Sequence, residues 1–220
     1  MFLLKKISII LIYFLFAGFI QETPKETWHL KKFEKGISVY TRQVENSRLK
    51  ELKSDFQIKT SLSSIVALLN DFESYPQWVY RCEKSYVAKK ISDMEFIQYQ
   101  SVKAPWPVDN RDILIYKKLS QDPITKVITQ KAYAMPEFIP KVAKHVRVLL
   151  FKAQWTITPL QNGLVNVEYQ LLVDPGGSIP AWLVNLAVVD GPYDTELNMK
   201  EWLMKDKYQK AVIPYIKEPK

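Results

Sequence analysis

The stretch AQWTITPLQNGLVNVEYQLLVDPGGSIPAWLVN, residues 153–185, indicates the fold class of this chain. Apolar and polar residues alternate on both sides of Asn162-Gly163, and an Asn-Gly pair between two alternating runs is a strong β-hairpin signal. We therefore predict antiparallel strands over residues 146–158 and 164–173. In the first of these the apolar residues move from even positions to odd positions at Leu150-Phe151, which predicts a β-bulge there.

A long apolar helix is predicted to follow the hairpin. Ser178 is expected to cap it, with Pro180 in the first turn, where proline is tolerated. Apolar residues continue at helical spacing as far as Val189. Asp190-Gly191-Pro192 is expected to kink or break the helix, which would resume over residues 195–205. Such a helix is either a buried core element or a lid over a ligand tunnel.

The remainder of the chain is predicted to be mostly strands, after two short helices. A short helical piece is expected before Gly36, and the two helices are expected over residues 61–69, with Ser61 or Ser63 as the N-cap, and around 77–79. The further strands are expected over residues 37–44, 51–58, 85–91, 95–102, 111–120 and 126–134. Consecutive strands with helices segregated in sequence predict an α+β fold, in which the long helix covers the concave face of a curved antiparallel sheet.

Composition argues against several classes of function. The 220 residues carry a net charge of +8, but the lysines are dispersed and form no basic run interleaved with aromatic residues, so we expect no nucleic-acid partner. Cys82 is the only cysteine, and there are two histidines, His29 and His145. No nucleophile, phosphate-loop or zinc motif is present. We therefore expect no catalytic residues, no metal site and no cofactor, and we expect Cys82 to be a packed side chain.

The N-terminal residues 1–21 resemble a targeting segment. Lys5 and Lys6 precede an apolar run over residues 7–20, which is short for a membrane span and typical of a secretory signal. We expect the protein to be exported to the periplasm or secreted. The alternative is that the segment is retained and tethers the protein to the inner membrane.

The stretch APWPVDNRD, residues 104–112, contains two unusual features. Trp106 lies between two prolines, which hold it in an extended loop, so that it either presents its indole to a ligand or plugs one end of the core. Strand alternation places Arg111 on the same face as Ile113 and Ile115. An inward arginine is either paired with an acid at the start of the strand or is a polar contact in an apolar cavity.

The ordered set GISVYTR, YPQW, PWPVDNRD, AQWTITPLQNGLVNVEYQLLVDPGG and IPAWLVN resembles the START domain, the steroidogenic-acute-regulatory-protein-related lipid-transfer family, in its bacterial form. The resemblance implies a helix-grip fold over residues 22–207, with residues 208–220 as a basic tail. It also implies an apolar tunnel between the sheet and the C-terminal helix. Combined with strand and helix periodicity, it predicts ten ligand-binding residues: Trp78, Tyr99, Trp106, Arg111, Trp155, Tyr169, Trp182, Asn185, Leu186 and Val189.

The sequence departs from the family pattern at the partner expected for Arg111. By the resemblance, an inward glutamate should face this arginine, but Gln98 or Gln100 stands in its place. The first hypothesis is a monomeric, non-enzymatic carrier or sensor of a lipid or other hydrophobic molecule, with transient contact to anionic membranes. The second is a helix-grip enzyme, such as a cyclase, aromatase or hydrolase, that uses Arg111, Tyr99 and Asp112. The third is a membrane-tethered interaction protein whose tunnel is collapsed.

Overall fold

The structure is a computed structural model that describes residues 27–177, 179 and 181–219, with the backbone alone over residues 181–187. The predicted targeting segment, residues 1–21, and the predicted helix residues Ser178 and Pro180 lie outside the described residues. Within the described ranges, no helix has both the length and the apolar character needed to cross a membrane.

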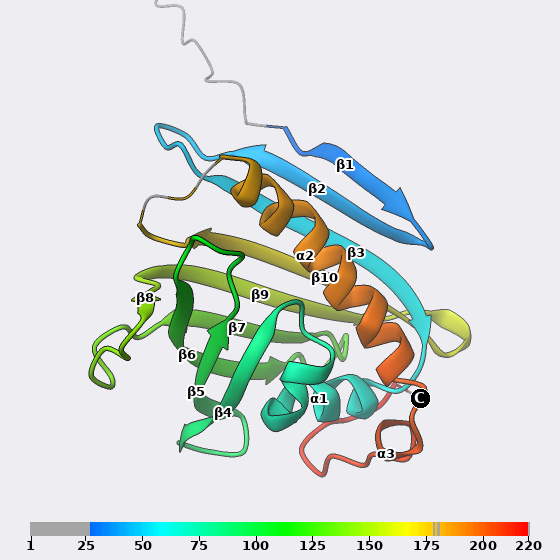
Figure 1. Ribbon diagram of the computed structural model, residues 1–220. Helices are drawn as coiled ribbons and strands as arrows, with labels where there is room; N and C mark the ends of the chain where they lie inside the picture. The colour runs from blue at the N-terminus through cyan, green and yellow to red at the C-terminus, as the bar shows by residue number, and fades with distance from the viewer. Residues whose placement is uncertain (1–26, 178, 180, 220) are drawn as a thin grey trace, which may run out of the picture.

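One antiparallel sheet dominates the fold, with the strands in the order β1-β2-β3-β10-β9-β7-β6-β5-β4 (Figure 1). A further strand, β8, pairs in parallel with β6 at the edge of this path. The strands are β1 (His29–Glu34), β2 (Ile37–Gln43), β3 (Lys50–Lys59), β4 (Cys82–Lys90), β5 (Glu95–Val102), β6 (Asn110–Gln121), β7 (Ile128–Ala134), β8 (His145–Arg147), β9 (Leu150–Pro159) and β10 (Leu164–Asp174).

Apart from the short 3₁₀ turn η2 (Gln161–Gly163) in the β9–β10 hairpin, four helical elements accompany the sheet, and they lie on one side of it (Figure 1). They are α1 (Leu62–Asn70), η1 (Phe72–Gln77, a 3₁₀ helix), α2 (Ala181–Trp202) and α3 (Asp206–Gln209). The long helix α2 runs across the face of the curved sheet, and α1 and η1 lie beside its C-terminal half. This arrangement confirms the predicted α+β helix-grip fold.

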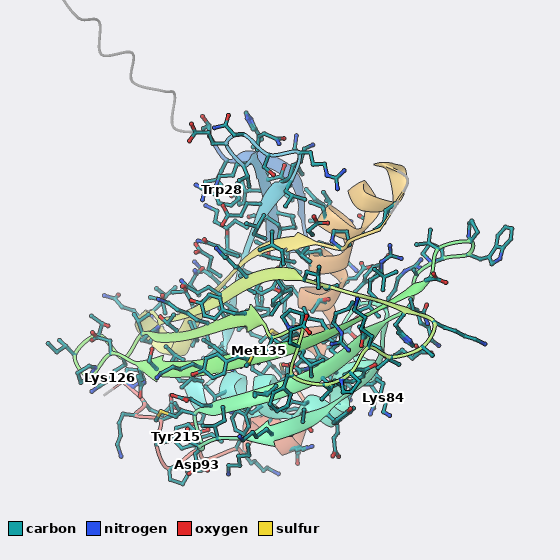
Figure 2. All side chains as sticks on the ribbon, turned by 90° about the vertical axis from the view of Figure 1, so that its left-hand side faces the viewer. Trp28, Lys84, Asp93, Lys126, Met135 and Tyr215 are labelled. Carbon is teal, nitrogen blue, oxygen red and sulfur yellow. The ribbon has the colours of Figure 1, made fainter. Side chains whose placement is uncertain are left out.

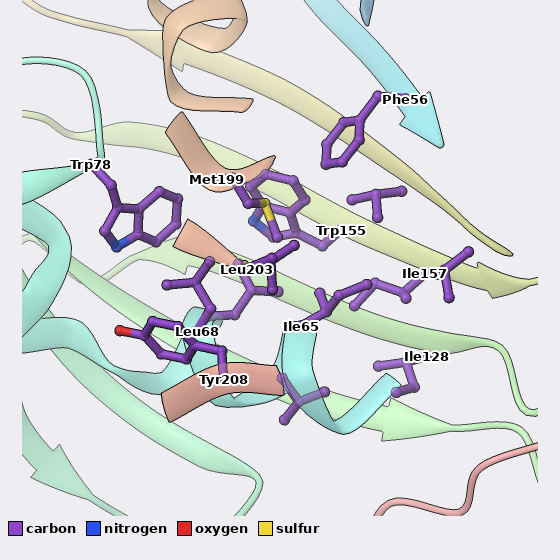
Figure 3. Close-up of a cluster of buried hydrophobic side chains, with 14 of the residues drawn as sticks. Phe56, Ile65, Leu68, Trp78, Ile128, Trp155, Ile157, Met199, Leu203 and Tyr208 are labelled. Atoms are coloured by element: carbon purple, nitrogen blue, oxygen red, sulfur yellow. The ribbon is translucent and has the colours of Figure 1, made fainter. Parts of the chain in front are cut away.

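The main core lies between the sheet and these helices (Figure 3). Leu68 of α1, Met199 of α2 and Leu203, which directly follows α2, pack against Trp155 and Ile157 of β9. The core is built from the odd-numbered residues of β9 because alternate side chains of a strand point to the same face. A smaller cluster, around Ile97, Tyr99 and Leu114, lies on the opposite face of the sheet.

The predicted hairpin is confirmed. Strands β9 and β10 pair from Pro159↔Val165 to Leu150↔Asp174. Asn162 and Gly163 both adopt positive φ, at 60° and 71°, in the three-residue turn that the Leu160 amide closes by donating to the Leu164 carbonyl. Helix α1 also begins as predicted, because the Ser61 hydroxyl accepts a hydrogen bond from the Ser64 amide at 3.0 Å.

Three predictions about secondary structure were wrong. The shift in apolar phase at Leu150 is a break between two strands and not a bulge, because β8 pairs with β6 while β9 pairs with β7. Helix α2 continues through Pro192 instead of breaking there, and Tyr193 and Met199, which follow the proline, are buried against the core. The piece before Gly36 is strand β1, which pairs along β2.

The segment after Lys207, which we expected to be a tail, packs onto the same domain over residues 208–219. The side chains of Tyr208 and Ile216 are buried in the main core. The Glu218 carboxylate accepts hydrogen bonds from the amides of Leu62 and Ser63, at 2.9 and 2.8 Å. A carboxylate at this position satisfies free amides in the first turn of α1 and complements its dipole.

Candidate ligand-binding cavity

A cavity of about 940 Å³ lies between the concave face of the sheet and the helices α2 and η1. This volume falls within the range of small-molecule binding sites. Apolar and aromatic side chains dominate its wall. On the sheet they include Leu52, Val102, Ile113, Ile115, Ala132, Phe151, Ala153, Trp155, Tyr169, Leu171 and Val173, and Val148 lies between β8 and β9. On the helices and the loop after η1 they include Leu69, Tyr75, Trp78, Val79 and Val188.

Strand alternation determines which residues reach the cavity. Along β6 the odd-numbered residues Arg111, Ile113, Ile115 and Lys117 line it, as was expected for the first three. Across β9 and β10, Trp155 and Tyr169 are direct partners in the register. Their rings stack with centroids 4.2 Å apart, which forms a rigid aromatic wall.

Arg111 lines the cavity and is only 8% exposed. Backbone carbonyls hold its guanidinium: Nη2 donates to Gly176 at 3.1 Å, Nε donates to Pro175 at 3.4 Å, and Nη1 donates to Asp109. No carboxylate in the described part of the chain forms an ion pair with it. Burial lowers the pKa of Arg111, which nevertheless stays charged at neutral pH.

Gln98, one of the two candidates for the missing glutamate, is bonded elsewhere. Its Nε2 donates to the Ser85 hydroxyl at 2.7 Å. Its Oε1 is buried and has no donor among the residues described. The other candidate, Gln100, lines the cavity. The charge pair implied by the family resemblance is therefore absent here.

Asp112, next to Arg111 in sequence, points to the opposite face of the sheet. There it forms a fully buried, bidentate ion pair with Arg147, with Nε–Oδ1 and Nη2–Oδ2 distances of 3.0 and 2.8 Å. Arg147 also donates to the carbonyls of Ile139 and Pro140. Two consecutive residues thus have separate roles: one faces the cavity and the other anchors the loop between β7 and β8.

Lys117 lies at the inner end of the cavity, far from Arg111 along β6. Its Nζ donates to the Tyr75 hydroxyl at 3.0 Å. Burial lowers its pKa to about 7, because the surroundings supply little compensating negative charge. The sequence analysis did not select this residue, although its odd position on β6 is the signal that predicts an inward side chain.

Glu196 reaches the cavity from helix α2. One carboxylate oxygen accepts a hydrogen bond from the buried Ser54 hydroxyl of β3, and the other has no donor among the described residues. Burial raises the pKa of this carboxyl to about 8. The sequence analysis missed it too, although positions 196 and 199 lie on one stripe of the helix.

Four of the ten predicted ligand-binding residues line the cavity, namely Trp78, Arg111, Trp155 and Tyr169. Tyr99 does not, because its odd position on β5 directs it to the opposite face, where it stacks on Tyr86. The Trp106 side chain is 90% exposed, so it neither lines the cavity nor plugs the core. Val189 is half-buried against the main core and lies outside the cavity wall. The side chains of Trp182, Asn185 and Leu186 lie outside the described residues.

Basic residues surround the outer end of the cavity. Arg48, Lys50, Arg81 and Lys103 line it there and are exposed to solvent. Ala104 and Pro105 line the same end, so the loop that carries the exposed Trp106 begins at this rim. Among the described residues, no group of histidines, cysteines and carboxylates has the arrangement of a metal site.

Comparisons with known proteins agree with this geometry. Residues 22–192 match the START domain. The chain is 33% identical over 170 residues to an uncharacterized protein of Pseudomonas aeruginosa, covering 77% of this chain and 83% of that protein. It is 26% identical over 169 residues to the phosphatidylcholine transfer protein of Mus musculus, covering 74% and 78%. The crystal structure of a STAR-related lipid transfer protein fragment from Xanthomonas axonopodis is 35% identical, with a TM-score of 0.75, covering 81% of this chain and 99% of that one.

Proposed function

Because this chain belongs to the START domain family, we propose that its cavity binds a lipid or another hydrophobic small molecule, which the protein carries or senses without catalysis. The cavity itself is the observation that carries the proposal: about 940 Å³, walled mainly by apolar side chains. Burial of each methylene group of a ligand contributes about 0.8 kcal/mol, so an alkyl chain provides useful affinity with few polar contacts. Two similar proteins are named for lipid transfer, which supports the same conclusion.

Native mass spectrometry followed by organic extraction tests this function. We expect the purified protein to carry a stoichiometric apolar mass that is lost on denaturation, or to take one up from mixed liposomes. Ala153→Phe should abolish this, because Ala153 lines the cavity, whereas Ala143→Phe on the exposed surface should not. A clean apo mass with no uptake by the unmodified protein would refute the proposal.

The structure separates the three polar groups on which the enzymatic alternative depends. Arg111 faces the cavity, while Tyr99 and Asp112 lie on the other side of the sheet. General acid–base or covalent catalysis requires the participating groups to be within hydrogen-bonding reach of one substrate, and these three groups cannot meet around one. We therefore keep ligand binding without turnover as the proposed activity.

The rim supports a transient contact with an anionic membrane. Trp106 presents an exposed indole on the loop that begins at the rim, and the basic side chains of Arg81 and Lys103 also lie at this rim, a combination that suits the interface of a bilayer with acidic lipids. Trp106→Ala should weaken cosedimentation with vesicles of phosphatidylglycerol and phosphatidylcholine several-fold. The control is Ile124→Ala, which removes an 87% exposed side chain in the turn marked by Lys126, at the opposite end of the sheet (Figure 2). Equal losses for both variants would contradict a specific role for the rim.

We also propose that residues 1–21 direct export to the periplasm, or anchor the protein if they are retained, and that the domain acts as a monomer. The apolar run behind Lys5 and Lys6 supports the export signal. The intact mass of the protein from a bacterial host decides between cleavage and retention. A protein that keeps residues 1–21 and remains in the cytosolic fraction would refute both forms of the proposal.

A further inference from the structure

The inner end of the cavity contains a buried lysine without an acidic partner. Lys117 is 6% exposed, and no carboxylate of the described residues lies within ion-pairing distance of its Nζ. Its neighbours are aromatic, with ring centroids of Phe72 and Tyr75 at 5.0 and 4.9 Å from Nζ. Aromatic faces attract a cation only weakly, so they do not replace a counterion.

The hydrogen bonds around Lys117 leave its ammonium group partly free. Tyr75 accepts from Nζ, and its own proton is used in a 2.6 Å hydrogen bond to the Leu69 carbonyl. A protonated lysine has three N–H groups, so two remain available to the cavity. An unpaired buried charge is costly, and the attraction of an anion that enters the same space offsets part of this cost.

A second polar atom marks the same end of the cavity. Gln130 of β7 is opposite Leu119 of β6 in the register, which makes it a diagonal neighbour of Lys117. Its Oε1 is buried and has no donor among the described residues, and its side chain also lines the cavity. Gln130 Oε1 shows that this end of the cavity is polar, but a carboxylate cannot donate to it, so the free N–H groups of Lys117 are the ones that an anion would contact.

We propose that the cavity selects long-chain carboxylic acids, with the ligand carboxylate bound to Lys117 Nζ at the inner end. This inference rests on the proposed function and names the class of ligand. Residues Arg111 and Lys117 are six positions apart on one strand, which is a separation of roughly 20 Å. The cavity face between them is formed by Ile113 and Ile115, so an alkyl chain has an apolar path from Lys117 toward the rim.

The charged and titratable groups around this end favour the same ligand at mildly acidic pH. Tyr75 and Cys82, which face Lys117, have raised pKa values and stay neutral, and so does Tyr169 across the cavity. The pKa of Glu196 on α2 is about 8, so its carboxyl is neutral at about pH 6 and does not repel a bound acid.

Calorimetric titration at about pH 6 with decanoate and 1-decanol tests the inference. The unmodified protein should bind decanoate at least ~10-fold more tightly, as expected for a hydrogen-bonded ion pair removed from water. Lys117→Met should abolish this preference. Lys118→Met is the matched control, because Lys118 is the next residue on the strand but is exposed and paired with Glu95 at 2.7 Å.

Equal affinities of the unmodified protein for the acid and the alcohol would overturn the inference, and so would a preference that survives in Lys117→Met. If neither probe binds, the proposed function itself fails. A measurement on the unmodified protein avoids any dependence on how the variant folds.

The pKa of Lys117 near 7 means that the amine loses its proton between about pH 6 and 8, so the affinity for decanoate should fall about ten-fold over that interval. The affinity for decanol should stay constant, and a pH-independent ratio would contradict the inference.

Discussion

Replacement of Glu196 by glutamine should stabilise the protein, and increasingly so as the pH rises. The Glu196 carboxyl is fully buried, with one oxygen bonded to Ser54 and the other without a donor in the described structure. Its pKa is about 8, against 4.5 in the unfolded chain. The folded state therefore binds more protons than the unfolded state between these two values, so the wild-type protein loses stability as the pH rises through this window.

The size of the effect follows from the pKa difference. Each unit corresponds to about 1.4 kcal/mol, so the full cost of ionising Glu196 is about 4 to 5 kcal/mol above its folded pKa. Glu196→Gln keeps the shape and a neutral side chain at all pH values. The variant should exceed the wild type in free energy of unfolding by about 1 kcal/mol near pH 5 and by about 4 kcal/mol near pH 8.

Urea unfolding followed by tryptophan fluorescence, at several pH values in this range, measures both free energies. The difference between the two proteins isolates Glu196, because Lys117 and every other titrating group is common to both. Glu201→Gln, in an exposed position on the same helix, should show no such trend. A difference between Glu196→Gln and wild type that stays constant from pH 5 to 8 would refute the reasoning, since a carboxyl with an unshifted pKa has no effect of this kind.

Two further substitutions test the contributions of the buried ion pair and of the α1 N-cap to stability. Arg147→Leu leaves Asp112 buried without its partner and should destabilise the protein by about 3 to 5 kcal/mol in urea unfolding. The control, Arg42→Leu, removes a more exposed pair with Glu51 and should cost less than about 1 kcal/mol. Similar losses in the two variants would contradict the larger effect expected for the buried ion pair. Ser61→Ala removes the N-cap of α1 and should cost about 1 kcal/mol by the same assay, whereas Ser61→Asn should retain most of the stability.

The polar groups of the cavity show a common feature. Lys117, Glu196 and Gln130 all lie inside the domain with incomplete hydrogen bonding, and each reduces the stability that an apolar residue would provide at its position. Groups of this kind concentrate at binding sites, because a bound ligand can complete their interactions. A ligand that pairs with Lys117 would therefore stabilise the folded protein in proportion to its affinity.

Strand faces could be assigned from the sequence wherever the apolar period is strict. Alternation correctly placed Arg111, Trp155 and Tyr169 on the concave side, and the same rule applied to β6 predicts Lys117 there. Tyr99 was predicted to bind the ligand, and the enzymatic hypothesis used it together with Arg111 and Asp112. Its odd position on β5 pairs it with Leu114, an outward residue of β6. The register between β5 and β6 was therefore needed to decide which face of the sheet the odd-numbered residues of β5 occupy.

Local sequence determined the hairpin at Asn162-Gly163, the cap at Ser61 and the inward face of β6, because turn geometry, capping and alternation depend on residues close together in the chain. Only the tertiary structure decided the partners of the buried charges. Two of the three carbonyls that hold Arg111 come from residues 175 and 176, Asp112 meets Arg147 of β8, and Glu196 of α2 meets Ser54 of β3. Those contacts join segments from 35 to 142 residues apart. The pKa of a buried group depends on such distant neighbours and on burial itself, so the chemistry of the cavity emerges only when the chain has folded.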